Sequence, residues 1–152
     1  MSDFVYLDIC CFKRPFDDAA VQRVRREAEA VAAILAAAQA GSLQLVRSPA
    51  HELENERYPR EDRRLATRLW LDAAAARVTA SAATALRARE LAALGFGPLD
   101  ALRLAFAEQS AARWFVTTDD RLLNRALTER DRLRVEVLRP DHVPLATGGD
   151  HV

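Results

Sequence analysis

This sequence has only two cysteines, a single lysine and no excess of positive or negative charge. Its two cysteines, Cys10 and Cys11, are adjacent, a spacing that provides neither a disulfide framework nor a metal-binding pattern. The 22 basic residues balance the 22 acidic ones, and Lys13 is the sole lysine. Because the formal net charge is zero, no overall field attracts nucleic acid, and any such contact has to come from a local basic patch.

Long apolar runs and glycine-rich motifs are also missing. No run approaches the roughly 20 residues that cross a bilayer, and Asp3 and Asp8 interrupt the apolar N-terminus. We therefore expect no membrane span and no signal peptide, and predict a soluble, cytoplasmic protein. The Gly-Phe-Gly stretch at 95–97 is only a turn, so nucleotide-binding glycine signatures are absent. Half of the residues are hydrophobic, which is typical of a globular domain.

What the sequence does contain is an alternation of short apolar runs with helical patterns. Strands are predicted at 4–7, 43–46, 114–117 and 135–138, with a weak candidate at 77–79. Helices are predicted at 18–40, 49–57, 60–75 and 84–94, from 98 onward and after 119. This alternation predicts an α/β fold with a short parallel central sheet flanked by helices. We expect a single domain over residues 1–140 and a flexible C-terminal tail over 141–152.

Four acidic residues have similar positions relative to the predicted strands. Asp8 ends the first strand, and Asp119 follows the strand at 114–117. Asp100 lies in the first turn of a helix, and Glu54 lies in the second turn of another. Helices that follow parallel strands begin at the edge where the strands end, so all four can converge there. Because clustered carboxylates repel one another unless a cation lies among them, the pattern predicts Mg²⁺-dependent phosphodiester hydrolysis.

Each carboxylate also has a purely structural interpretation. Asp100 could simply favour the positive end of its helix, and Asp119 or Asp120 could cap the helix that follows. Glu54 alone could be a solvated helix residue. Asp8 is harder to explain in this way, because an aspartate that closes a buried apolar strand needs a partner. The joint pattern therefore carries more weight than any one member.

Four segments, taken in order, resemble successive motifs of the PIN-domain family. They are VYLDICCFKRPFDD at 5–18, RSPAHELENERYP at 47–59, GPLDALRLAFAE at 97–108 and WFVTTDDRLL at 114–123. The VTTDD stretch and the DAL-x-LA helix are the most specific matches, and the segments cover nearly the whole chain. The resemblance is to stand-alone prokaryotic PIN-domain proteins. It implies a Rossmann-like, PIN-like domain with a Mg²⁺- or Mn²⁺-dependent ribonuclease site, frequently in the toxin of a toxin–antitoxin pair.

The resemblance also implies a metal-binding and catalytic set, made of Asp8, Glu54, Asp100 and Asp119. These residues would hold one or two Mg²⁺ (or Mn²⁺) ions, directly or through waters. Glu52 and Glu56 remain alternatives to Glu54. Arg103 stands where related sequences often have histidine, a difference that we expect to alter the rim of the cleft. The implied partners are an RNA substrate, a cognate antitoxin and a second copy of the chain in a homodimer.

Neighbouring residues receive structural assignments. We expect Ile9, Cys10 and Cys11 to serve packing, and Glu27 to join a salt-bridge network among arginines. Thr117 could orient Asp119, although a β-branched residue at a strand end needs no such role. The three histidines do not form a cluster and are predicted to lie on the surface. The apolar positions that could form a homodimer surface or belong to the core are Leu65, Leu69 and Trp70.

Other α/β proteins that place an aspartate after their first strand fit less well. A dehalogenase-type phosphatase needs a second acid two residues after Asp8, where Cys10 stands, and a receiver domain needs a late lysine. The serious rival is a PIN fold that acts as a binding or assembly module with feeble or no cleavage. The full acidic set argues against that rival, whereas the neutral charge leaves it open. Under the nuclease hypothesis, Asp8→Asn should abolish cleavage and, by relieving repulsion, slightly stabilise the metal-free protein.

Overall fold

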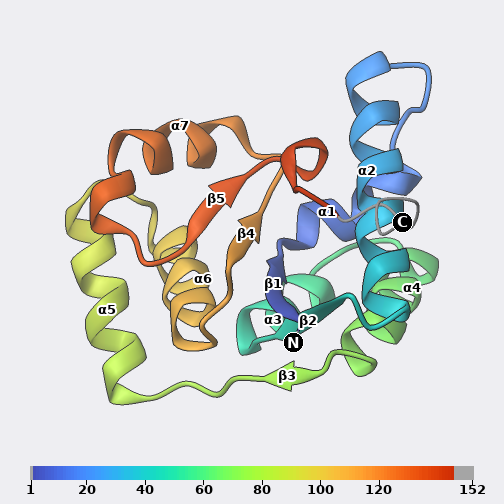
Figure 1. Ribbon diagram of the computed structural model, residues 1–152. Helices are drawn as coiled ribbons and strands as arrows, with labels where there is room; N and C mark the ends of the chain where they lie inside the picture. Colours follow the sequence, from blue (N-terminus) through green and yellow to red (C-terminus); the bar gives the residue numbers. More distant parts are fainter. Residues whose placement is uncertain (1, 146–152) are drawn as a thin grey trace, which may run out of the picture.

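The computed structural model describes residues 2–145 and contains a five-stranded sheet in which each strand runs parallel to its neighbours (Figure 1). The strands are β1 (Asp3–Leu7), β2 (Leu43–Arg47), β3 (Ala76–Arg77), β4 (Trp114–Val116) and β5 (Glu136–Leu138). Their order is β3-β2-β1-β4-β5, so β1 is the central strand. The predicted α/β class with a short parallel sheet is therefore confirmed, and the arrangement is Rossmann-like.

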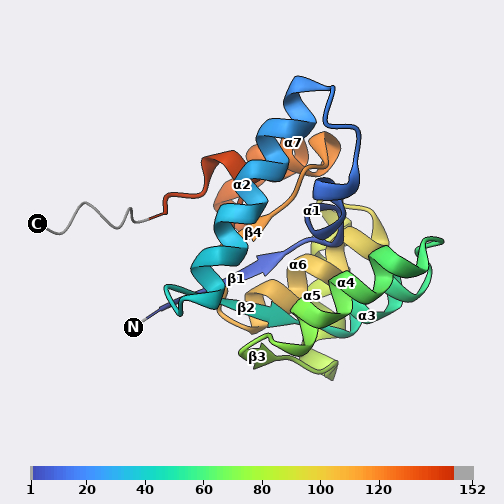
Figure 2. The same cartoon turned by 90° about the vertical axis from the view of Figure 1, so that its right-hand side faces the viewer.

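Helices cover both faces of this sheet. In the described part of the chain they are α1 (Ile9–Lys13), α2 (Gln22–Gln39), α3 (Pro49–Glu56), α4 (Glu61–Asp72), α5 (Ala82–Ala93), α6 (Pro98–Gln109) and α7 (Asp120–Thr128). Short 3₁₀ turns lie at η1 (Arg14–Phe16), η2 (Arg130–Arg132) and η3 (Pro140–His142). One apolar cluster joins the sheet to α1, α2 and α4, and the other joins it to α5, α6 and α7. Figure 2 views the molecule from the side of α2, with the sheet behind that helix.

The central strand is apolar at successive positions because both of its faces are covered. Val5 and Leu7 belong to the cluster with α2, and Tyr6 between them belongs to the cluster with α6. Alternate side chains of a strand point to opposite faces, so a strand buried on both sides needs an apolar residue at each position. The Tyr6 ring stacks on Phe115 of β4 at a centroid distance of 5.0 Å. This packing fixes the strand end at which Asp8 follows.

One helix was not predicted, and another begins later than predicted. The five-residue helix α1 was not predicted, because it follows β1 directly, with Asp8 serving as both the end of the strand and the helix cap. The helix predicted over 18–40 begins later, at Gln22. The Asp18 carboxylate instead accepts a hydrogen bond from the Ala20 amide at 3.0 Å and holds a turn. Such local side-chain bonds compete with helix formation.

The predicted boundary between domain and tail, at residue 140, is too early. The η3 turn packs against α2, and Val143 is buried in the same apolar cluster as Ile34. Asp141 also forms an ion pair with Arg26 of α2 at 3.4 Å. The domain therefore extends past Val143, and the rest of the predicted tail, residues 146–152, lies outside the described residues.

The apolar residues considered for a homodimer surface are on the outside of α4. Leu65 is 55% exposed and Leu69 is 71% exposed, while Trp70 is partly buried and packs against the cluster beneath α2. The two leucines are therefore not core residues, and pairing with a second copy stays a prediction. Within residues 2–145, no helix combines the length and the apolar character that crossing a membrane requires.

Candidate active site

The carboxyl ends of β1 and β4 form the edge on which the predicted acids lie. The chain builds β2 and β3 on one side of β1 and then returns to add β4 and β5 on the other. Ligand crevices in open α/β sheets form at such a reversal of strand order. Asp8 follows β1 and Asp119 follows β4, so both are placed at the reversal by topology alone.

Asp8 is almost fully buried and is held by several donors. Its Oδ1 accepts hydrogen bonds from the Ile9 amide at 2.9 Å and from Arg103 Nη1 at 3.0 Å. Its Oδ2 accepts from the Thr117 hydroxyl at 2.8 Å and from the same Arg103 nitrogen at 3.2 Å. The Thr117 oxygen in turn accepts from the Asp119 amide at 3.1 Å. Thr117 therefore contacts the backbone of Asp119, the residue that it was suggested to orient, and also links it to Asp8.

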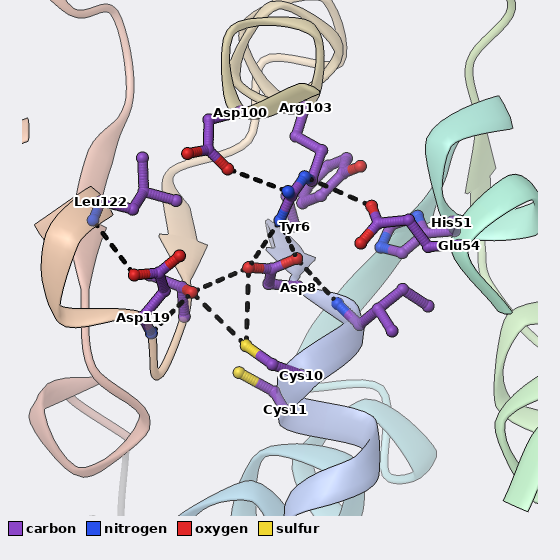
Figure 3. A network of polar contacts seen from close by, with 12 residues as sticks. Tyr6, Asp8, Cys10, Cys11, His51, Glu54, Asp100, Arg103, Asp119 and Leu122 are labelled. Carbon is purple, nitrogen blue, oxygen red and sulfur yellow. Dashed lines mark hydrogen bonds and ion pairs between the residues drawn. The ribbon is translucent and has the colours of Figure 1, made fainter. Parts of the chain in front are cut away.

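Arg103 lies at the centre of the cluster rather than at its rim (Figure 3). Its guanidinium contacts Asp8 at 3.0 Å, Asp100 at 2.9 Å and Glu54 at 3.3 Å. Its side chain is only 12% exposed. Arg103 lines the cavity beside these acids and also reaches into the cluster, because a residue one turn after Asp100 on α6 faces the same side as that acid.

The structure distinguishes Glu54 from its neighbour Glu52. Glu54 faces Arg103, whereas the Glu52 carboxylate pairs with Arg47, which also contacts Asp72 at 2.6 Å. The two glutamates are two residues apart on α3, so they point to different sides of that helix. The second acid brought to the cluster is therefore Glu54.

Asp119 has a different role from the other three acids in the described arrangement. Its Oδ1 caps α7 by accepting hydrogen bonds from the amides of Arg121 at 3.0 Å and Leu122 at 3.3 Å. It forms no ion pair with Arg103 among the contacts of residues 2–145. The structural interpretation of Asp119 as a helix cap is therefore correct, and the residue nonetheless lines the cleft beside Asp8.

The cluster has more negative than positive charge. Burial raises the pKa of Glu54 to about 7, an effect that Arg103 opposes and that Asp8 and Asp100 reinforce. Burial likewise raises the pKa of Asp100; Arg103 opposes this rise, and Asp119 and Asp8 add to it. At both carboxyl groups the effect of burial therefore outweighs the attraction of Arg103 and favours the protonated form.

The donor set suits Mg²⁺ or Mn²⁺ in chemistry and charge, but the guanidinium lies in the space between the acids. All four side chains offer carboxylate oxygens, and Glu54 Oε1 is buried without a hydrogen-bond donor. In the described arrangement, however, no three histidine, cysteine or acidic side chains of residues 2–145 stand close enough together to hold an ion. The residues fit a divalent cation by type, and the Arg103 guanidinium contacts three of the four carboxylates.

His51 is a residue of the site that sequence reasoning misplaced. It was expected on the surface, yet it is buried, with its ring stacked on Tyr6 at a centroid distance of 4.4 Å. Its Nε2 donates to the Leu7 carbonyl at 2.7 Å, and its Nδ1 accepts from the Ser48 amide at 3.1 Å. Burial lowers the pKa of His51 to about 4, so the ring is neutral. The Ser-x-x-His spacing, which forms a capping box at the start of α3, was the available sign in the sequence.

Glu27 forms the predicted salt-bridge network and ties α2 to the loop that carries Asp119. Its buried carboxylate lies 3.3 Å from Arg14 and 3.4 Å from Arg23. Arg23 also donates to both oxygens of Asp120, at 2.7 and 2.8 Å, and to the Thr118 carbonyl at 3.2 Å. This bidentate contact fixes the backbone on each side of Asp119.

Lys13 holds α1 against α3 and α4 from within the same cleft. Its buried ammonium donates to Asn55 at 2.6 Å, to Thr67 at 2.7 Å and to the Arg63 carbonyl at 3.2 Å. It also lies 4.4 Å from the centroid of the Tyr58 ring. Burial lowers the pKa of Lys13 to about 8, and the nearby arginines add to this effect. No feature of the sequence indicated this role.

Two cavities flank the acidic cluster. One, of about 330 Å³, is lined by Asp8, Glu54, Arg103 and Asp119 together with Cys10, Lys13, Arg14 and Tyr58. The other, of about 320 Å³, is lined by Asp100 and Asp119 together with Arg121, Arg125 and the glycine turn at 95–97. A larger cavity of about 700 Å³ between α2 and α4 is lined by apolar and uncharged residues and contains none of the acids. The two smaller cavities are therefore the candidates for substrate access.

Comparison with known proteins does not assign this chain to a family. A scan against protein-family models found no match, and a search of the curated proteins found none either.

Proposed function

We propose that this protein is a divalent-metal-dependent endoribonuclease of the PIN type. The observation that supports the proposal most directly is that Asp8, Glu54, Asp100 and Asp119 come from separate places in the chain to one edge of a parallel sheet. Three of them share Arg103, and the fourth is joined to Asp8 through Thr117. RNA as the substrate rests on the resemblance of the four sequence segments.

The four carboxylates are the side chains that would hold Mg²⁺ or Mn²⁺. When bound, the ion supplies a Lewis acid that activates water and neutralises charge developing on the phosphate. Thr117 orients Asp8 through its hydroxyl hydrogen bond, and Arg23 fixes the backbone around Asp119. Arg121 and Arg125, which line the neighbouring cavity, are suited to bidentate contacts with the phosphates of the RNA chain.

Asp8→Asn and Asp119→Asn should each abolish metal-dependent cleavage while the protein stays folded, because each variant removes one of the carboxylate charges. The assay is cleavage of a single-stranded RNA pool with Mg²⁺ or Mn²⁺, and with EDTA as the metal-free reference. Asp131→Asn is the matched control, since Asp131 is exposed on η2 and lines neither cavity beside the cluster. Full activity of the Asp8→Asn protein would contradict the assignment.

A binding or assembly module is the second candidate, and the position of Arg103 favours it. The guanidinium neutralises part of the charge of three acids, as a metal ion would. Such a module would bind RNA or protein equally well with and without divalent ions and would cleave nothing. Cleavage that depends on Mg²⁺ and on Asp8 excludes this alternative. A cognate antitoxin, a homodimer and a cytoplasmic location stay predictions of the family resemblance and the sequence.

A further inference from the structure

We propose that Arg103 is the resident cation of this site, and that it competes with a divalent metal ion for the same carboxylates. The inference rests on the proposed function and concerns how that site is regulated. The guanidinium draws together acids from three parts of the chain: Asp8 after β1, Glu54 on α3 and Asp100 on α6.

Arg103 and a metal ion would compete for the same lone pairs of the Asp8 carboxylate. A carboxylate has about four lone-pair sites on its two oxygens. At Oδ1 these serve the Ile9 amide and Arg103, and at Oδ2 they serve the Thr117 hydroxyl, Arg103 and, at 3.5 Å, the Cys10 thiol. Mg²⁺ binds carboxylate oxygen at about 2.1 Å. An ion that binds Asp8 directly must therefore displace Arg103 Nη1, which now lies 3.0 and 3.2 Å from the two oxygens.

The contact with Glu54 is the least satisfied of the three. Arg103 Nε and Glu54 Oε1 lie 3.3 Å apart, yet both atoms are buried without a hydrogen bond. A single planar guanidinium therefore cannot give good geometry to all three acids at once. Glu54 Oε1 therefore stays without a donor beside the cavity of about 330 Å³, which Glu54 and Arg103 both line. The carboxylates attract a cation that enters this cavity, and the like charge of Arg103 opposes its arrival.

Removing the guanidinium should strengthen metal binding. The probe is Mn²⁺ alone, titrated by calorimetry and by thermal unfolding into the wild-type protein and the Arg103→Gln variant. The variant should bind Mn²⁺ at least about tenfold more tightly, which corresponds to about 1.4 kcal/mol. Arg87→Gln is the matched control, because Arg87 forms a comparable buried ion pair with Glu108 at 2.6 Å and lines neither cavity beside the acids. Its Mn²⁺ affinity should equal that of the wild type.

The outcomes separate this inference from the proposed function. Equal Mn²⁺ affinity in the wild type and in Arg103→Gln overturns the competition and leaves the metal-dependent nuclease standing. Absence of Mn²⁺ binding in both proteins overturns the metal-dependent function, and the competition with it. If Arg103→Gln does not fold, Arg103→Lys decides, because a single ammonium cannot contact three acids as the guanidinium does. Tighter Mn²⁺ binding by that variant supports the competition, and unchanged binding refutes it.

Discussion

Replacing Asp8 by asparagine should destabilise the metal-free protein, which reverses the expectation from sequence. Repulsion among four carboxylates predicted a slight gain in stability. In the structure, however, Asp8 accepts two bonds from Arg103 and one each from Thr117, Ile9 and the Cys10 thiol. Arg103 therefore already offsets part of the repulsion, and the substitution removes one of the acids that hold this guanidinium.

The size of the effect follows from the contacts that are lost. A hydrogen bond to a charged group contributes about 1.5–3 kcal/mol. Breaking a buried ion pair costs about 3–5 kcal/mol when the remaining charge has no other partner. Arg103 keeps Glu54 and Asp100, so the smaller range applies. We expect the free energy of unfolding to fall by about 2 kcal/mol.

Urea unfolding in EDTA at neutral pH, followed by circular dichroism, measures this change. For a urea m-value of about 2 kcal/mol per molar, the midpoint should fall by about 1 M. Asp119→Asn is the control, because Asp119 caps α7 without contacting Arg103 and asparagine is an equally good cap. Its unfolding free energy should change by less than about 0.5 kcal/mol. A midpoint for Asp8→Asn equal to or above that of the wild type would refute the role assigned to Arg103.

Two further predictions concern pH. His51 has a pKa of about 4 in the folded protein, compared with 6.5 ordinarily. Between these pH values the unfolded chain binds more protons than the folded protein, so the free energy of unfolding falls as the pH drops from 6.5 to 4. The full loss is about 3 kcal/mol, and the urea midpoints of His51→Gln should lack that component between pH 7 and pH 4. Lys13 has a pKa of about 8 against 10.5, so the unfolded chain again binds more protons between these values and stability rises as pH increases through them. The Lys13→Met variant should lose this rise in stability, which is about 3 kcal/mol at most. Urea unfolding of both proteins at about pH 7.5 and 10.5 measures it. If the rise persists in the variant, a group other than Lys13 causes it.

The strands and the positions of the acids could be predicted because both depend on local patterns. The apolar run before Asp8 indicates a covered strand, and parallel topology then places Asp8 and Asp119 at one edge. Glu54 was less certain, since Glu52 offers the same side chain at almost the same position. The choice between them depends on the rotation of α3, which is fixed by contacts of His51 and Ser48 with β1.

The roles of the other side chains in the site were harder to predict, because they depend on contacts between segments that are distant in the sequence. Lys13 meets Asn55 and Thr67 only after α3 and α4 fold back on α1. His51 looked like a surface residue because it lies among charged residues, although its spacing from Ser48 indicated a cap. The sequence also contained an indication for Arg103, since Asp100 lies one turn before it on the same face of α6.

The identity of residue 103 determines how the acidic cluster is balanced when no metal is bound. Arginine is always charged and carries five donors on a long side chain, which is why Arg103 contacts three acids from one helix position. A histidine at this position has a shorter side chain with two ring nitrogens, and it titrates near neutral pH. It could not contact Asp8, Glu54 and Asp100 together, so the acids would stay uncompensated and open to a divalent ion. If the proposed metal-binding function holds, the presence of arginine at position 103 therefore bears on the affinity of the four acids for a divalent ion.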